Sequence, residues 1–118
     1  MNIQIFGTKK SSDARKAERW FKERRIRAQF IDLADKGISR GELRSAAQAV
    51  GGLEALIDPD CRDRDALALA RHIAPAQLEE VLLDHPQVLR QPIVRNGKRA
   101  AVGYAPGVYA AWQAEEAR

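Results

Sequence analysis

The chain has 118 residues, a hydrophobic fraction of 45% and a formal charge of +4, with a pI near 9.6. This length predicts a single domain spanning residues 1–118, and the apolar content excludes a disordered chain. No apolar run approaches the ~20 residues of a membrane-spanning helix, and the first residues lack the features of a signal peptide, so we expect no membrane contact and a cytoplasmic location.

The charged residues are mixed in sign along the sequence. Glu23-Arg24-Arg25 and Arg62-Asp63-Arg64-Asp65 show the pattern. Net positive charge favours anionic partners in general, but interleaved signs predict a solvated mixed surface without a single-faced basic stripe. Because no DNA-binding motif is present either, we expect no direct nucleic-acid binding.

Cysteine and histidine are too sparse for redox pairs or metal sites. Cys61 is the single cysteine, which excludes an intrachain disulfide, and the two histidines are distant in sequence. We therefore expect no metal site.

The first third of the chain predicts a strand, a helix and a second strand. Residues 2–6 alternate apolar and polar side chains, as a strand does, and residues 7–10 form a loop. Ser11, Ser12 or Asp13 can cap a helix that ends near Arg25, and its apolar positions recur at helical spacing. Residues 28–33 predict the second strand.

The middle of the chain predicts several helices. Ser39 and Glu42 have the spacing of a capping box, and Gly51-Gly52 ends the helix that follows. Residues 53–57 predict a short helical turn. Residues 62–73 predict a helix whose buried face holds either Leu67 and Ala70 or Leu69 and Ile73, and residues 76–84 follow Pro75 as another helix.

The last third predicts a hairpin and a final helix. Residues 92–95 and 98–102 are strands joined by Asn96-Gly97, the dipeptide typical of a tight turn. Residues 106–112 predict a helix, and residues 114–118 are expected to fray. A parallel β-α-β unit followed by an antiparallel hairpin gives an α/β fold with a four-stranded mixed sheet and a helical insertion at about 39–86. That arrangement resembles thioredoxin-like proteins of the glutaredoxin type.

Several short segments, in order, also resemble the ArsC/Spx family of arsenate reductases, their relatives and the Spx transcription regulators. The resemblance covers nearly the whole chain. Its segments are Ile5-Phe6-Gly7, Arg15-Lys16-Ala17 with Trp20, Asp32, Gly37-Ile38-Ser39 with Leu43, Leu89 to Val94, and Val102 to Pro106 with Tyr109.

The resemblance implies a reductase scaffold without its nucleophile. In arsenate reductases of this family, a cysteine thiolate at the first helix attacks arsenate and glutathione resolves the product. That cysteine falls on Ser11 here, and the second cysteine of Spx-like members falls on Ala14. The arginine before the family's proline falls on Gln91, and another falls on Tyr104. A third, expected between residues 56 and 67, has no clean counterpart because Pro59, Asp60 and Asp65 occupy the likely places.

Ligand-binding residues remain at the same place. Lys9, Lys10, Ser11, Ser12 and Arg15 surround the predicted helix N-terminus, where N–H groups and the helix dipole favour an anion. By resemblance, Gln91 and Pro92 form a cis peptide beside this helix, in a groove that accepts glutathione or a peptide.

Three functional hypotheses follow. The first is a catalytically degenerate binding or regulatory module whose partner, by resemblance to Spx, is RNA polymerase. The alternative is a glutathione-dependent arsenate or thiol-disulfide reductase that uses Cys61, or uses bound glutathione without a protein thiol. The third is a protein that binds glutathione or another small anion. Beyond glutathione as co-substrate or ligand, no cofactor is expected. Ser11 as a nucleophile would need an adjacent base, and the sequence places none, so helix capping is its predicted role.

Overall fold

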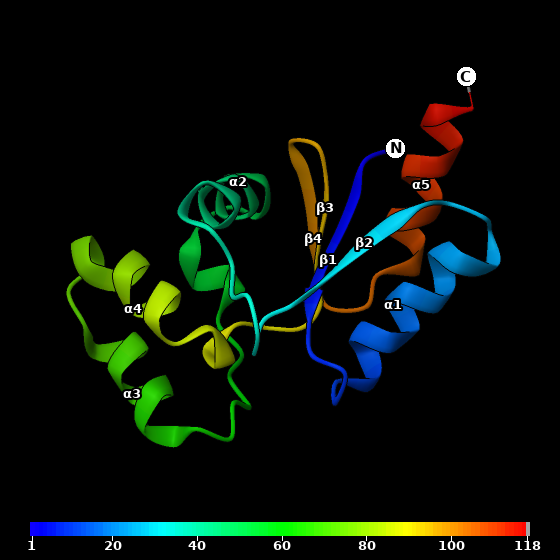
Figure 1. Ribbon diagram of the computed structural model, residues 1–118. Helices are drawn as coiled ribbons and strands as arrows, with labels where there is room; N and C mark the ends of the chain where they lie inside the picture. Colours follow the sequence, from blue (N-terminus) through cyan, green and yellow to red (C-terminus); the bar gives the residue numbers. More distant parts are fainter. Residues whose placement is uncertain (118) are drawn as a thin grey trace.

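The computed structural model describes residues 1–117 as helices packed on both faces of a four-stranded sheet (Figure 1). Strand β1 (Ile3–Gly7) runs parallel to β2 (Ala28–Asp32) and antiparallel to β3 (Ile93–Asn96), which pairs antiparallel with β4 (Arg99–Val102). The strand order is β2-β1-β3-β4. The helices are α1 (Ser12–Glu23), α2 (Arg40–Val50), η1 (Leu53–Leu56), α3 (Arg64–His72), η2 (Pro75–Gln77), α4 (Leu78–Asp84), η3 (Pro86–Val88) and α5 (Pro106–Glu116).

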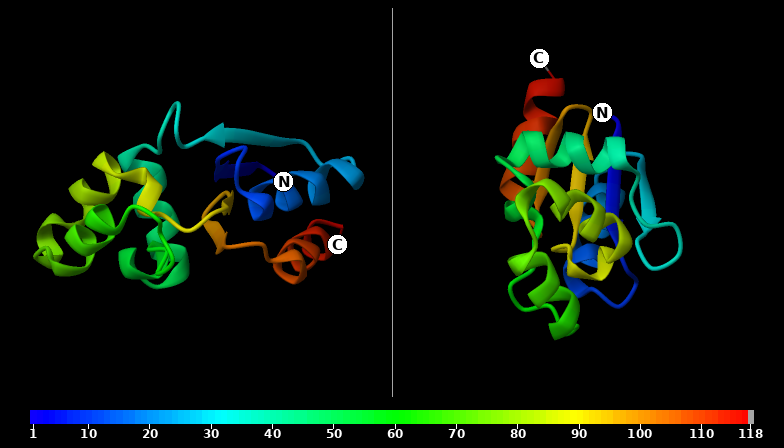
Figure 2. Two further views of the ribbon diagram at one scale, coloured as in Figure 1. Left: turned by 90° about the horizontal axis from the view of Figure 1, so that it is seen from below. Right: turned by 90° about the vertical axis from the view of Figure 1, so that its left-hand side faces the viewer.

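The sheet separates two hydrophobic cores. Because successive side chains of a strand point to opposite faces, Ile5 of β1 packs with Phe21 of α1 and Tyr109 of α5, whereas its neighbour Phe6 packs on the other face with Leu43 and other residues of the insertion. Figure 2 shows the same layering, with α1 and α5 away from the other helices. In residues 1–117, no helix is both long and apolar enough to cross a membrane.

Short-range capping signals are confirmed. Ser11 caps α1, and Ser39 and Glu42 form both hydrogen bonds of a capping box at α2, of 3.2 and 3.0 Å. Gly51 ends α2 in the left-handed conformation, with φ of 99°, which a residue without Cβ adopts at little cost. These features fix where the helices begin and end.

The predicted middle helices differ in detail from the observed ones. Of the two alternative faces of the helix at 62–73, Leu67 and Ala70 are buried while Leu69 is 40% exposed, and the helix itself, α3, is shorter. The helix predicted at 76–84 is divided into η2 and α4, since the first turn after Ala74 is 3₁₀.

The prediction that the chain frays from residue 114 is wrong for the residues described. Helix α5 continues to Glu116, where two ion pairs hold its last turn: Arg99 of β4 with Glu115, and the amino group of Met1 with Glu116 at 2.8 Å. These partners lie far away in sequence, so local patterns do not show them. Arg118, the last residue of that prediction, lies outside the described residues.

Candidate functional site

The N-terminus of α1 packs directly against the end of β1. A Cβ placed on Gly7 would lie 2.6 Å from the Cβ of Ala14, closer than such atoms approach in proteins. Ala14 itself is fully buried. Only glycine fits at position 7 with this spacing, and the side chain at position 14 is part of the packed interface between strand and helix.

The Ser11 side chain caps the N-terminus of α1 by a hydrogen bond to the helix backbone. Its Oγ accepts a hydrogen bond of 3.1 Å from the N–H of Ala14, and its own N–H donates to the carbonyl of Thr8 at 3.1 Å. Among residues 1–117, no side chain that could act as a base is hydrogen-bonded to the Ser11 hydroxyl. The geometry is that of an N-cap rather than of an activated nucleophile.

Gln91 ties the start of β3 to the loop before α1. Its Oε1 accepts hydrogen bonds from the N–H of Thr8 at 2.7 Å and from the Thr8 hydroxyl at 3.1 Å. The peptide between Gln91 and Pro92 is cis, as predicted, and the carbonyl of Pro92 accepts a hydrogen bond of 2.8 Å from Gly103. The Gln91 side-chain oxygen is therefore already occupied by two hydrogen bonds from the loop before α1.

The remaining predicted binding residues are exposed around the junction between the α1 N-terminus at Ser11 and the Gln91–Pro92 peptide. Lys9, Lys10, Ser12 and Arg15 all face solvent at the N-terminal end of α1. Their charges and the helix dipole favour an anion, and they supply hydrogen-bond donors but no thiol. The arrangement can hold a small anion electrostatically.

Cys61 belongs to a different part of the molecule. It lies between η1 and α3, its side chain is 5% exposed, and its Sγ is 3.3 Å from the carbonyl oxygen of Gln87. It packs in the core of the insertion, and no described contact joins it to the residues around Ser11. Within residues 1–117, no three His, Cys, Asp or Glu side chains converge to hold a metal ion.

Two residues beside the junction are missed by the sequence-based prediction. Thr8 donates hydrogen bonds to Gln91. The Arg90 side chain lies beside Gly103: its Nη2 atom is 3.5 Å from the position that a Cβ on Gly103 would occupy. The resemblance points to position 91 for an arginine, so it does not predict the guanidinium at position 90. Gly103 has φ of 78°, and its carbonyl accepts a hydrogen bond of 3.2 Å from the hydroxyl of Tyr109. Burial raises the pKa of Tyr109 to about 12.

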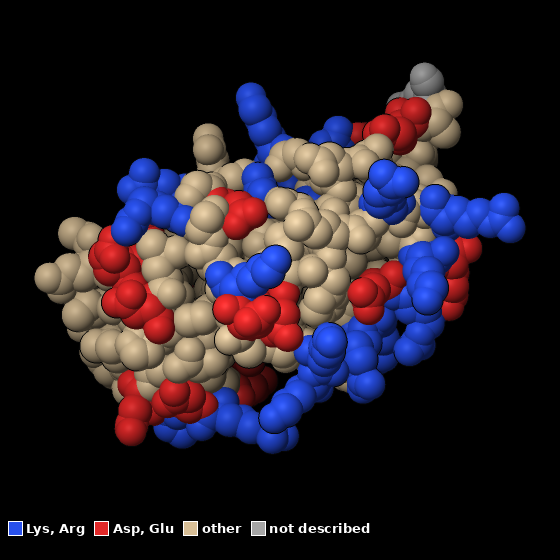
Figure 3. Space-filling model, in the orientation of Figure 1, with Lys and Arg blue, Asp and Glu red and all other residues tan. Residues whose placement is uncertain are grey.

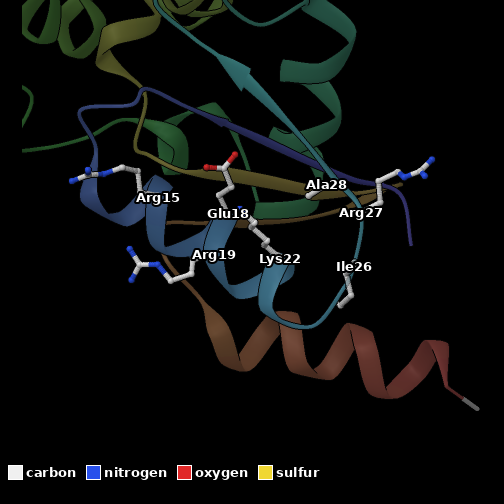
Figure 4. A pocket seen from close by; sticks show the side chains of 7 residues that line it. All are labelled: Arg15, Glu18, Arg19, Lys22, Ile26, Arg27 and Ala28. Atoms are coloured by element: carbon white, nitrogen blue, oxygen red, sulfur yellow. The ribbon is translucent and has the colours of Figure 1, made fainter.

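The predicted absence of a basic stripe is wrong. Figure 3 shows Lys and Arg gathered over the side of the molecule that α1 forms. Arg15, Arg19 and Lys22 lie along α1 and line one hollow together with Arg27, which precedes β2 (Figure 4). The cluster is not evident in the linear sequence because its residues are separated by apolar and acidic ones. The helical repeat brings the three α1 residues onto one face.

Comparison with known proteins identifies the fold and the family. Residues 6–112 match the model of the ArsC family. The chain belongs to the ArsC family. Among curated proteins, it is 31% identical over 106 residues to "Global transcriptional regulator Spx 2" of Oceanobacillus iheyensis, over 88% of this chain and 78% of that protein.

Solved structures show the same ArsC-like, thioredoxin-type fold. An ArsC family related protein from Bacteroides fragilis superimposes with a TM-score of 0.80 at 16% identity, over 94% of this chain and 97% of that one. An arsenate reductase from Vibrio cholerae gives a TM-score of 0.79 at 22% identity, over 94% and 97%. At these identities the likeness concerns the fold alone.

Proposed function

We propose that this ArsC-family protein is a binding module with a regulatory role and no thiol chemistry at α1. One observation carries the proposal: the two residues at the family's cysteine positions, and Gln91 at the arginine position before the proline, each have a structural task. Ser11 caps the helix, Ala14 is buried against Gly7, and the Gln91 oxygen accepts from Thr8. A hydroxyl without an adjacent base cannot replace an attacking thiolate.

A small anion or glutathione is the ligand proposed for the N-terminal end of α1. Lys9, Lys10 and Arg15 supply charge, and the exposed Ser12 supplies hydrogen-bond donors. Titration of the ¹⁵N-labelled protein with glutathione, and separately with phosphate, is expected to shift the amide signals of residues 11–14 saturably. If neither compound moves these signals, the ligand proposal fails.

RNA polymerase is the partner proposed for the same surface. The support is the 31% identity to a protein named as a global transcriptional regulator of the Spx type. Purified RNA polymerase immobilised on a sensor is expected to bind the full chain, and the double change Lys9→Glu with Lys10→Glu is expected to weaken binding by about tenfold.

A matched control variant distinguishes the effect of this surface from an effect of the net charge of the protein. Arg62→Glu with Lys98→Glu alters the net charge equally at two exposed residues outside the junction, and is expected to leave binding unchanged. Absence of binding by the unmodified protein, or equal loss in both variants, would contradict the proposed partner surface.

Glutathione-dependent reduction of arsenate or a disulfide is the alternative function. The favourable observation is the fold shared with the Vibrio cholerae arsenate reductase. A protein thiol for this reaction would have to be Cys61, which is buried and 3.3 Å from the Gln87 carbonyl oxygen. This alternative predicts turnover that disappears in Cys61→Ser, or, if bound glutathione acts alone, turnover that survives the change.

A further inference from the structure

The positive charge of the molecule is concentrated in one segment. Residues 15–27 contain seven Lys and Arg but two Glu, a charge of +5 against +4 for the whole chain, so all other residues together carry −1. Figure 3 shows Lys and Arg gathered over the side of the molecule formed by α1, with mixed signs on the rest of the visible face. A charge concentrated in this way marks a surface for an anionic partner.

This surface contains a groove between α1 and the start of β2. The groove has a volume of about 530 Å³, with Arg15, Arg19 and Lys22 in one row and Arg27 on the strand side (Figure 4). Apolar Ile26 and Ala28 also line it, as does Glu18. Within residues 1–117, none of these four cations forms an ion pair.

The strand beside the groove has an unpaired edge. β2 is the outermost strand, and it pairs with β1 alone among the described elements. The N–H and C=O groups along the other side of β2 are therefore free to pair with an added strand. Adding an extended peptide to such an edge is a common mode of peptide recognition, in which main-chain hydrogen bonds give affinity and side-chain contacts give specificity.

We propose that an acidic, extended segment of a partner protein adds to the free edge of β2 and places its carboxylates against the α1 row. Alternate side chains of a strand are about 6.6 Å apart on one face. Arg15 and Arg19 are about 6 Å apart along the helix axis, and Arg19 and Lys22 about 4.5 Å. The spacing of carboxylates at alternate positions is therefore close to that of Arg15 and Arg19, whereas Lys22 lies about 2 Å nearer to Arg19 than the next carboxylate would.

The lining of the groove favours a peptide over a nucleic acid. The free N–H and C=O groups along the edge of β2 can pair with a peptide main chain, and the apolar lining residues Ile26 and Ala28 offer no aromatic ring for bases to stack on. Apolar side chains between the carboxylates of a peptide would instead contact these two residues. Arg15 lies at the border with the Ser11 and Gln91 junction, but Arg19, Lys22, Arg27 and the edge of β2 lie outside it, so the inference does not depend on the proposed function.

The test uses the full chain and a short synthetic peptide in which glutamate alternates with valine. Saturable binding is expected by fluorescence anisotropy, with amide shifts confined to residues 28–32 and the α1 row. The change Arg19→Glu with Lys22→Glu is expected to weaken binding by about tenfold or more. Arg62→Glu with Lys98→Glu, an equal charge change at exposed residues elsewhere, is expected to leave affinity within about twofold.

Binding measurements with a second peptide and with an oligonucleotide distinguish strand addition from other modes of binding. The same peptide N-methylated at alternate amides keeps its charge but loses strand pairing, so it is expected to bind weakly. Equal binding of both peptides would overturn strand addition, and no binding of either would overturn the acidic partner. Tighter binding of a short oligothymidylate, lost in the Arg19 and Lys22 variant, would identify a nucleic-acid surface instead. Circular dichroism of each variant verifies folding.

Discussion

At the N-terminus of α1, single side chains determine how the helix begins and how it packs on β1. Gly7 and Ala14 allow the strand and helix to meet at a distance that larger residues would prevent, and Ser11 satisfies a helix N–H that would otherwise lack a partner. The three residues form one compact unit, so each has a measurable effect on stability that does not depend on any ligand.

The first prediction concerns Gly7. Gly7→Ala introduces a Cβ 2.6 Å from that of Ala14, and overpacking of this kind is expected to lower the free energy of unfolding by about 1–3 kcal/mol. Gly41→Ala is the control, since nothing lies within 4 Å of its added Cβ and it is in a helix, where alanine is favoured. Urea unfolding that shows no difference between the two variants would contradict the packing at Gly7.

The second prediction concerns the cap. Ser11→Ala removes the acceptor for the Ala14 N–H and is expected to lower the free energy of unfolding by about 1 kcal/mol. Ser11→Asp keeps an acceptor and adds a charge that the helix dipole favours, so it is expected to retain stability. If Ser11→Ala is as stable as the unmodified protein in urea, the hydroxyl has another role.

Among the elements, an ion-pair cluster joins α2 to α4. Glu79 accepts hydrogen bonds from Arg40 at 2.6 Å and from Arg44 at 2.6 and 3.0 Å, and Arg40 also pairs with Glu80. The Arg44 and Arg40 guanidinium groups hold the pKa of Glu79 down, at about 2 instead of its ordinary value of 4.5. The cluster connects helices that are more than 30 residues apart in sequence.

The third prediction follows from the sign of this shift. Because the folded-state pKa is depressed, the contribution of Glu79 is complete above about 4.5 and is lost as the pH falls toward about 2. The stability difference between the unmodified protein and Glu79→Gln is therefore expected to shrink over that window, when urea midpoints are measured at low salt. Glu54→Gln, an exposed carboxylate without a described ion pair, serves as the control. A difference that stays constant with pH would contradict the shift.

How far each element could be predicted depends on how local its cause is. The capping box at Ser39 and the Asn96-Gly97 turn arise within four residues, so the sequence predicts both. In contrast, the hydrogen bonds from Thr8 to Gln91 join residues that are 83 positions apart. The last turn of α5 likewise depends on ion pairs with Met1 and Arg99. Such pairings follow from the register of the sheet, which periodicity does not determine. The helical face of Arg15 and Arg19 could have been found by projecting the sequence onto a helical wheel.

At the scale of the whole molecule, the insertion and the sheet share a core. Leu82 of α4 packs in the same cluster as Phe6, Ile31 and Ile93 of the strands, while Trp20 and Trp112 lie in the cluster on the opposite face. Because one sheet forms a wall of both cores, we expect the chain to unfold as a single cooperative unit.

The fourth prediction tests this cooperativity. Leu82 is fully buried, so Leu82→Ala is expected to cost about 2–5 kcal/mol and to shift the unfolding seen by tryptophan fluorescence as much as that seen by circular dichroism. Leu69→Ala removes the same atoms from a side chain that is 40% exposed and is expected to have a much smaller effect. A separate early transition seen by circular dichroism alone would mean that the insertion unfolds independently.

We propose that this ArsC-family protein is a binding module without thiol reductase activity. An assay of the purified protein for reduction of arsenate and of a mixed disulfide, with glutathione and glutaredoxin supplied, tests this claim. The claim predicts no turnover above the protein-free background, in the unmodified protein and in Cys61→Ser alike. Clear turnover by the unmodified protein would contradict it, and its loss in Cys61→Ser would place the reaction at that thiol.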